Sequence, residues 1–270
     1  MDTEEVVENI VEIENLMVSY DDRVVLDGVN FQVRRGETMV ILGGSGCGKS
    51  TLLRHIIGLE RPTSGRIMIK GRDLTVMGEE EMSGILSKVG VVFQSSALFN
   101  SMTIGDNVAL PLREHTKLEE STIKIMTKIK LEMVGLSGFE SYLPSELSGG
   151  MRKRAAFARA ISMDPEILFC DEPSAGLDPI VGAGLDQLII KLSKALRMTI
   201  VVVTHEMESM YTIADRVLML HNGRVMFCGT VEEFRACDNE RVRQFIERRP
   251  EEHHEEESGQ YVRALTSDSF

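Results

Sequence analysis

Residues 43–50 read Gly-Gly-Ser-Gly-Cys-Gly-Lys-Ser, and this stretch decides the fold. It fits the pattern G-x-x-x-x-G-K-[ST], in which glycines allow the backbone to wrap closely around phosphate groups. An apolar run typical of a buried strand, residues 38–42, precedes it, and a helical pattern, residues 49–59, follows it. Successive N–H groups and a helix N-terminus with about half a unit of positive charge attract anions, so this arrangement predicts a nucleotide phosphate site.

The residues of this loop have distinct expected roles. Lys49 should reach the β- and γ-phosphates of a nucleotide, and Ser50 should ligate Mg²⁺. The residues predicted to bind the nucleotide here are Gly43, Gly44, Ser45, Gly46, Cys47, Gly48, Lys49, Ser50 and Thr51.

The stretch Ile-Leu-Phe-Cys-Asp-Glu at residues 167–172 supplies the second half of the site. Its four apolar residues predict a buried strand that delivers Asp171 to its end, where the carboxylate can hold Mg²⁺ through water. Glu172 follows directly and is placed to polarise the attacking water as a catalytic base. Taken alone, an apolar run ending in two acids is an ordinary strand terminus, but its place after a phosphate loop favours catalysis.

Further short runs at residues 89–93 and 199–204 are apolar on both faces, as strands of a parallel sheet covered by helices are. Between residues 93 and 167 the pattern is helical, and no predicted strand interrupts it. The sequence therefore predicts an α/β core with a mostly helical insert at about residues 95–163. The remaining predicted strands are residues 11–20, 24–33, 217–220 and 225–228, and the remaining predicted helices are residues 103–112, 119–134, 149–163 and 239–249.

The composition argues against several classes of function. Hydrophobic residues make up 43% and charged residues 27% of the 270, as in a globular protein, and no apolar run approaches the roughly 20 residues of a membrane-spanning helix. The net charge is −12, of which residues 1–14 carry −6 and residues 239–270 carry −3, and this acidity argues against nucleic-acid binding. The N-terminus lacks the basic and apolar segments of a secretory signal, so we expect a cytoplasmic protein. Four scattered cysteines without Cys-x-x-Cys spacing indicate neither a disulfide nor a zinc site.

Residues 147–151 read Leu-Ser-Gly-Gly-Met and precede a helix rich in arginine and alanine. A Ser-Gly-Gly turn that opens a helix is a second anion site, although the chain already has a complete phosphate loop. Such a turn makes sense if it caps the γ-phosphate held by another subunit. Here the sequence resembles the ABC ATPases, whose signature motif is Leu-Ser-Gly-Gly-Gln; Met151 departs from it at the last position. The resemblance implies that Ser148, Gly149 and Gly150 bind ATP across a dimer.

The resemblance extends over residues 12–237 and implies further site residues. Tyr20 matches the aromatic residue that stacks on adenine. Gln94 matches the glutamine that contacts Mg²⁺ and water and links to the membrane partner, and His205 matches the switch histidine near the γ-phosphate. Residues 174–178, Ser-Ala-Gly-Leu-Asp, match the loop that crosses the dimer interface. The implied enzyme is a homodimeric ATPase that uses ATP and Mg²⁺.

The implied fold is an α/β P-loop NTPase core of the ABC ATPase type, with an antiparallel β subdomain and an inserted α-helical subdomain. Residues 1–238 would form this ATPase domain. Residues 239–270 would form a C-terminal extension that contacts the dimer partner or a regulator.

The segments 94–103 and 107–115 resemble more narrowly the MlaF-type ATPases, which work with MlaE-type permeases and MCE-domain lipid-binding proteins. This resemblance implies transport of phospholipids or other hydrophobic molecules between bacterial membranes, with the chain held by the permease at the cytoplasmic face of the inner membrane. A small STAS-domain regulator is a further implied partner. Helix packing within the insert would explain the same segments without lipid, so an ABC importer for a small solute stays open. A soluble ABC ATPase of DNA repair or translation would carry a long coiled coil or a second phosphate loop, and the sequence has neither.

Overall fold

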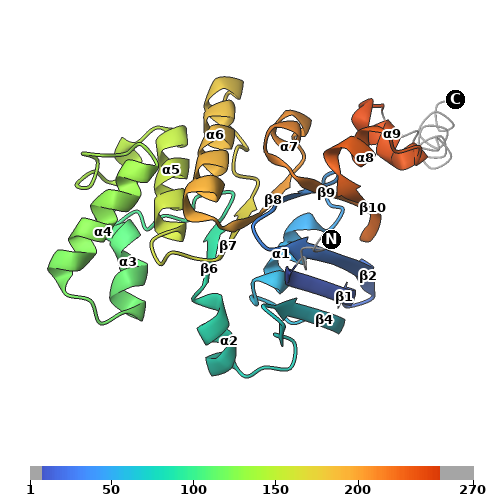
Figure 1. Cartoon of the computed structure of the whole chain (residues 1–270), viewed down its shortest axis with the longest axis horizontal. Helices are drawn as coiled ribbons and strands as arrows, with labels where there is room; N and C mark the ends of the chain where they lie inside the picture. Colours follow the sequence, from blue (N-terminus) through green and yellow to red (C-terminus); the bar gives the residue numbers. More distant parts are fainter. Residues whose placement is uncertain (1–7, 250–270) are drawn as a thin grey trace, which may run out of the picture.

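The computed structural model describes residues 8–249, which fold around two β-sheets (Figure 1). The smaller sheet is antiparallel and consists, in spatial order, of β2 (Arg23–Arg34), β1 (Asn9–Tyr20), β4 (Ser64–Ile69) and β5 (Arg72–Asp73). The larger sheet consists, in spatial order, of β10 (Arg224–Thr230), β9 (Arg216–His221), β3 (Thr38–Leu42), β8 (Thr199–Thr204), β7 (Ile167–Asp171) and β6 (Val89–Val92). Its strands are parallel except for β10, which pairs antiparallel with β9 at one edge. This architecture confirms the predicted α/β core with an antiparallel β subdomain.

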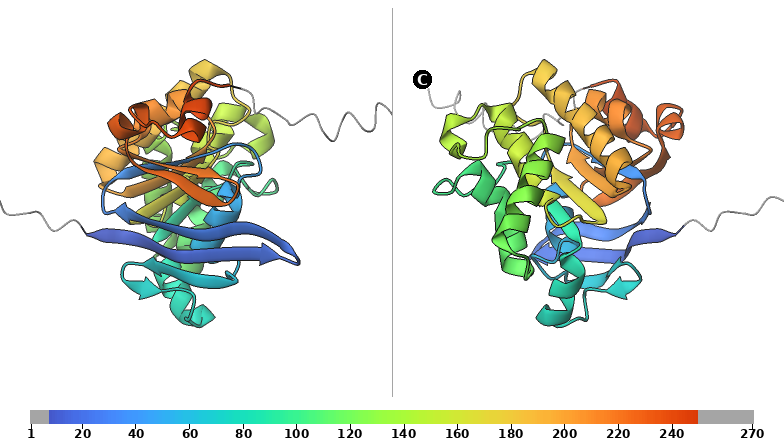
Figure 2. Two further views of the ribbon diagram at one scale, coloured as in Figure 1. Left: turned by 90° about the vertical axis from the view of Figure 1, so that its right-hand side faces the viewer. Right: turned by 60° about the vertical axis from the view of Figure 1, so that its left-hand side comes forward.

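The helices cover the larger sheet and form the insert. They are α1 (Lys49–Ile56), α2 (Glu79–Leu86), α3 (Ile104–His115), α4 (Glu120–Met133), α5 (Gly149–Ala160), α6 (Pro179–Leu196), α7 (Met207–Ile213), α8 (Val231–Arg235) and α9 (Glu240–Ile246), with a 3-10 turn at Pro144–Glu146. Within the described residues, only helices and turns lie between β6 and β7, and α3, α4 and α5 pack together at one end of the molecule (Figure 1). At the other end, α8 and α9 pack on β10 (Figure 2). None of the helices in residues 8–249 is long and apolar enough to cross a bilayer.

The side chains of β3 alternate between the two faces of the larger sheet and contribute to a hydrophobic core on each face. All five of its residues are buried. Met39 and Ile41 belong to the cluster that contains Leu52 of α1 and the inner face of the antiparallel sheet. Val40 and Leu42 belong to the cluster on the other face, formed with α5, α6 and the helices of the insert. Because neighbouring residues of a strand point to opposite faces, a continuous apolar run is what a sheet covered on both sides requires.

Most predicted elements are present, with ends shifted by a few residues. The helix expected over residues 49–59 ends at Ile56, because Gly58 adopts φ 73° and the Leu59 N–H donates to the Arg54 carbonyl at 2.9 Å. This is a Schellman cap, in which a left-handed glycine closes the helix. The structure also contains β4, β5, α2, α6, α7 and α8, which were not predicted from the sequence.

Candidate active site

The phosphate loop, residues 43–48, runs from the end of β3 to the first turn of α1. Gly46 and Gly48 have φ values of 74° and 105°, a left-handed region that is open to glycine and strained for other residues. A Cβ added to Gly43 would lie 2.5 Å from the Leu220 carbonyl oxygen, so the loop passes directly against the C-terminal end of β9. The first turn of α1 contains no acidic residue. Its N–H groups and the glycine backbone therefore form a concave surface suited to an anion.

Lys49 lies across this loop. Its Nζ donates to the carbonyl oxygens of Gly43 at 2.8 Å and Gly44 at 3.0 Å, and the residue is only 7% exposed. The tip of the loop, residues 44–46, is exposed, so Ser45 is accessible to a ligand. Cys47 is buried, and burial raises the pKa of its thiol, so it packs as an uncharged side chain. The loop therefore combines one positive charge in a fixed position, that of Lys49, with an exposed tip at residues 44–46.

Two strand ends bring oxygen ligands to the same side of the loop. The Ser50 hydroxyl, in the first turn of α1 beside Thr51, donates to Asp171 Oδ1 at 3.2 Å. Burial raises the pKa of Asp171, the hydrogen bond from Ser50 lowers it, and the nearby Glu172 carboxylate raises it. Gln94, which follows β6, lines a cavity of about 540 Å³ together with Asp171.

This oxygen set fits a magnesium ion only in the presence of a nucleotide. Within residues 8–249, no three His, Cys, Asp or Glu side chains gather into a metal site of their own. One carboxylate and one hydroxyl are nevertheless the kind of oxygen ligands that Mg²⁺ accepts when substrate phosphates and water complete its coordination. Ser50, Asp171 and Gln94 are thus the residues that could supply oxygen ligands to such a cation.

Glu172 occupies the position directly after β7 in an unusual conformation. Its φ is 45°, its N–H donates to the Val203 carbonyl of β8 at 2.9 Å, and it is 8% exposed. Both of its carboxylate oxygens lie 2.9 Å from His205 Nδ1, and the His205 side chain is 58% exposed. With its proton on Nδ1, the imidazole donates to the carboxylate and fixes its orientation. A carboxylate held in this way can accept a proton from a water molecule.

Tyr20 lies at the end of β1 and is 44% exposed. Its hydroxyl donates to the Glu60 carboxylate, and this hydrogen bond raises the pKa of Tyr20. Glu60 also lies 3.7 Å from Arg54 of α1, so the ring is connected to the helix that follows the phosphate loop. The exposed ring could therefore stack on a planar ligand, and Glu60 would fix its position.

Ser148, Gly149 and Gly150 form a separate part of the site. The Ser148 hydroxyl caps α5 by accepting from the Met151 N–H at 3.3 Å, and Ser148 itself is exposed. A Cβ at Gly150 would lie 2.5 Å from Val181 of α6, so glycine is also needed here for helix packing. Within the described residues, the cavities that include the phosphate loop or Asp171 do not include this turn.

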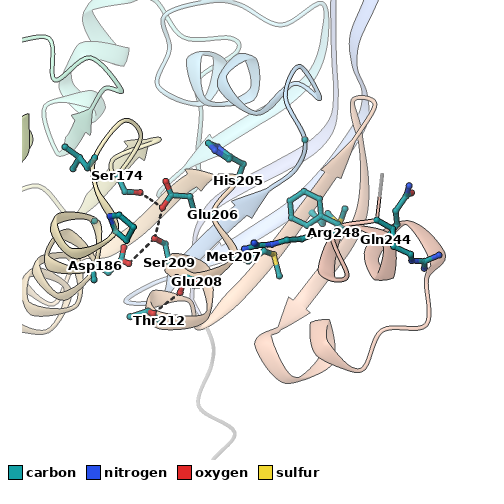
Figure 3. A pocket seen from close by; sticks show the side chains of 18 of the residues that line it. Ser174, Asp186, His205, Glu206, Met207, Glu208, Ser209, Thr212, Gln244 and Arg248 are labelled. Carbon is teal, nitrogen blue, oxygen red and sulfur yellow. Dashed lines mark hydrogen bonds between the residues drawn. The ribbon is translucent and has the colours of Figure 1, made fainter. Parts of the chain in front are cut away.

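A larger cavity of about 730 Å³ opens between α6, α7 and α9 (Figure 3). On one wall, the Ser174 hydroxyl donates to Glu206 at 3.1 Å and the Ser209 hydroxyl donates to Asp186 at 2.9 Å. Burial raises the pKa of Asp186. The opposite wall carries Arg241, Gln244, Phe245, Arg248 and Arg249 from α9 and the residues after it. Gly44 and His205 also line the cavity, so it extends from the phosphate loop and His205 to α9.

Neither the cavity wall at α9 nor Lys153 was predicted from the sequence to be part of the site. Lys153 is 6% exposed, and its Nζ donates to the carbonyl oxygens of Gln94 and Glu172. Burial lowers the pKa of Lys153, while the nearby Glu172 and Asp171 carboxylates raise it. One signal was available, because Lys153 shares a helical face with Ala156 and would stand out there as a charge among apolar residues.

The chain is similar to known proteins over most of its length. The family described as ABC transporter matches residues 26–175. The "Intermembrane phospholipid transport system ATP-binding protein MlaF" of Haemophilus influenzae is 42% identical over 239 residues, which are 88% of this chain and 90% of that protein. The "Probable ribonucleotide transport ATP-binding protein mkl" of Mycobacterium leprae is 43% identical over 236 residues, 87% of this chain and 68% of that protein. Among solved structures, a dimeric post-hydrolysis state of the ATP-binding cassette MJ0796 bound to ADP and Pi superimposes with a TM-score of 0.76 at 31% identity, covering 82% of this chain and 98% of that one.

Proposed function

This chain belongs to the ABC transporter family and is one of its ATP-hydrolysing subunits, and from this premise we propose that it powers the transport of phospholipids or related hydrophobic molecules between bacterial membranes. The observation that carries the proposal is the similarity to an MlaF protein along nearly the full length of both chains. The segments 94–103 and 107–115, which resemble MlaF-type ATPases, support the same assignment.

We assign the hydrolytic roles from the contacts in the site. Lys49 and the backbone of residues 43–48 would bind the β- and γ-phosphates of ATP. Ser50, Asp171 and Gln94 would hold Mg²⁺, whose charge would stabilise the phosphate oxygens. Glu172 would accept the proton of the attacking water, and His205, in contact with both carboxylate oxygens, would keep Glu172 in position and face the γ-phosphate.

The active form is proposed to be a homodimer that holds two ATP molecules at its interface. In one chain the Ser148–Gly150 turn shares no described cavity with the phosphate loop, so a second copy would bring the turn to the nucleotide. The similarity to a dimeric cassette structure supports this arrangement. ATP would then make contacts that exist only in the closed dimer, and its binding would shift the population toward closure.

The proposed partners are an MlaE-type permease, an MCE-domain lipid-binding protein and a STAS-domain regulator, which would place the chain at the cytoplasmic face of the inner membrane. The permease would contact the segment 94–103, where Phe99 is 51% exposed. The C-terminal extension, residues 239–270, would contact the dimer partner or the regulator; its portion beyond Arg249 lies outside the described residues.

A second candidate function is transport of a small polar solute. The mycobacterial relatives named for ribonucleotide transport are as similar in identity as the MlaF protein, which favours this alternative. The two candidates share the same ATPase and differ in the permease and the cargo.

Affinity capture of this chain from native membranes, followed by mass spectrometry of proteins and lipids, separates the candidates. We expect recovery of an MlaE-like permease and an MCE protein together with phospholipid. Recovery of a permease with a soluble solute-binding protein would overturn the lipid assignment and leave the ATPase assignment intact. Phe99→Asp should lose the permease, whereas Ile125→Asp, at a 60% exposed position of α4 outside this segment, should retain it.

A further inference from the structure

Lys153 makes a buried connection between three parts of the site. It lies in α5, three residues after Gly150 and therefore about 4.5 Å along the helix from the Ser148–Gly150 turn. Its Nζ donates to the Gln94 carbonyl at 2.6 Å and lies 3.4 Å from the Glu172 carbonyl. Figure 1 shows α5 running beside β6, the strand that Gln94 follows.

Helix packing alone does not explain a lysine at this position. A buried ammonium loses its hydration, and burial without a partner of opposite charge is unfavourable. Among residues 8–249, Lys153 Nζ forms no ion pair; the Glu172 and Asp171 carboxylates lie near enough to raise its pKa, but its hydrogen-bond acceptors are the two main-chain carbonyls. An apolar side chain of similar length would fill the same space without that penalty. What the ammonium adds is a hydrogen-bonded attachment to the backbone of Gln94 and Glu172.

Both attached segments have backbone conformations that need support. Glu172 has φ 45°, and Ser96 and Ala97, which follow Gln94, have φ values of 65° and 49°. Non-glycine residues keep such conformations only where surrounding contacts enforce them. Arg159, six residues after Lys153 on α5, donates to the Ala97 carbonyl at 2.7 Å and to the Ser96 carbonyl at 3.1 Å. One helix thus holds the segment 94–97 through three hydrogen bonds, from Lys153 and Arg159, and holds Glu172 through one.

We propose that Lys153 is a positioning residue for ATP hydrolysis, which holds the Gln94 segment and the Glu172 backbone in fixed relation to the helix that begins with Ser148–Gly150. The first turn of that helix would face the partner's ATP. A shift of the helix would therefore also shift the proposed base Glu172 and the proposed cation ligand Gln94 of the same chain. This inference rests on the proposed roles of Gln94 and Glu172.

Three variants of the full chain test the proposal. Lys153→Met keeps the length of the side chain and removes its donors, and Lys153→Arg keeps a charged donor. Arg154→Met is the matched control, because Arg154 on the same helix also donates to main-chain carbonyls, at Val134 (3.0 Å) and Gly184 (3.3 Å), which lie outside the site. For each variant, kcat and KM for MgATP and the thermal unfolding temperature are measured.

A displacement of catalytic groups by about 1 Å can reduce turnover about 100-fold. We therefore expect Lys153→Met to lower kcat by about 10- to 100-fold with KM within about twofold of wild type, Lys153→Arg to recover part of the loss, and Arg154→Met to keep kcat. The proposal is overturned if folded Lys153→Met keeps kcat, if only its KM changes, or if both methionine variants lose kcat in proportion to their unfolding temperature. Glu172→Gln, measured alongside, separates this inference from the site assignment: full turnover in that variant would refute the role of Glu172 whatever Lys153→Met shows.

Discussion

Glu172→Gln changes the charge of the proposed base while leaving its shape and backbone contacts in place. The two side chains have the same length, and an amide oxygen can still accept from His205 Nδ1, which lies 2.9 Å from each carboxylate oxygen. The hydrogen bond from the Glu172 N–H to the Val203 carbonyl involves only the main chain, so the φ of 45° should persist. The substitution therefore isolates the negative charge that would accept the proton of the attacking water.

The expected loss follows from what a positioned base contributes. General base catalysis accounts for about 10²- to 10⁴-fold in rate, and at about 1.4 kcal/mol for each factor of ten this corresponds to about 3–5.5 kcal/mol of activation free energy. Glu172 is 8% exposed, so bulk water has little access to replace it as proton acceptor. We therefore expect the loss to lie toward the upper end of that range.

Single-turnover hydrolysis, equilibrium ATP binding and sedimentation together test this prediction. We expect hydrolysis to fall about 10³- to 10⁴-fold while ATP still binds, with accumulation of an ATP-bound dimer. Glu166→Gln is the matched control, because Glu166 pairs with Arg35 and Lys70 away from the site and its loss should leave turnover unchanged. Turnover of Glu172→Gln at the wild-type rate would show that Glu172 is not the base.

Three further substitutions test other contacts of the site. Lys49→Ala should weaken ATP binding, measured by calorimetry, about 10- to 100-fold, since a hydrogen bond to a charged group contributes about 1.5–3 kcal/mol. Unchanged ATP affinity would show that Lys49 does not bind the phosphates. Asp171→Asn should abolish Mg²⁺-dependent hydrolysis but raise the unfolding temperature of the nucleotide-free chain at pH 7, because it removes a buried charge. Each kcal/mol gained in the free energy of unfolding corresponds to about 2–4 °C. Burial raises the pKa of Asp171 in the folded chain, so its protonation contributes stability that is fully present below the unfolded carboxyl pKa of about 4 and is lost as pH rises through the raised value. The difference in unfolding temperature between Asp171→Asn and wild type should therefore narrow at pH 4, and a wider difference at pH 4 would contradict this prediction. Glu60→Gln should raise the KM for ATP in steady-state kinetics about two- to fivefold, because the Tyr20 hydroxyl loses a charged hydrogen-bond acceptor. An unchanged KM would show that Glu60 does not contribute to nucleotide binding.

The parts of the site that were predictable are those fixed by short stretches of sequence. The phosphate loop needs glycines at particular positions and a strand and helix on either side, and all of these lie within residues 38–56. The buried strand β7 places Asp171 and Glu172 at its end for the same local reason. The predicted ends of β3 match the structure because Glu37 and Gly43 bound its apolar run, and the predicted ends of β8, at Thr199 and Thr204, match as well.

The elements that escaped prediction have weak or interrupted local patterns. α2 begins after Gly78 without a side-chain cap, and Ile85 is its one buried residue, so its sequence has little amphipathic character. α6 has clear starting signals, since Asp178 accepts from two N–H groups and Pro179 is its first residue, but Gly182 and Gly184 interrupt its pattern. In the structure α6 packs against α7 and α5, and periodicity within the α6 sequence does not record such contacts with other elements.

The nucleotide site keeps three charged side chains out of water, since Lys49, Lys153 and Glu172 are each 6–8% exposed. The two lysines are held by main-chain carbonyls and Glu172 by a histidine, so none is paired with a permanent opposite charge in the nucleotide-free chain. Buried charges held in this way add less to stability than apolar residues of the same size would. In the proposed mechanism Lys49 and Glu172 would act on the nucleotide and the attacking water with their charges already fixed in place, without the reorganisation that water requires, while Lys153 would keep the backbone of Glu172 in position. Turnover in such a site should depend strongly on each charge and each hydrogen-bond donor. Substitutions at Glu172 and Lys153 that remove a charge or a donor but keep the shape of the side chain should therefore lower turnover while the fold persists.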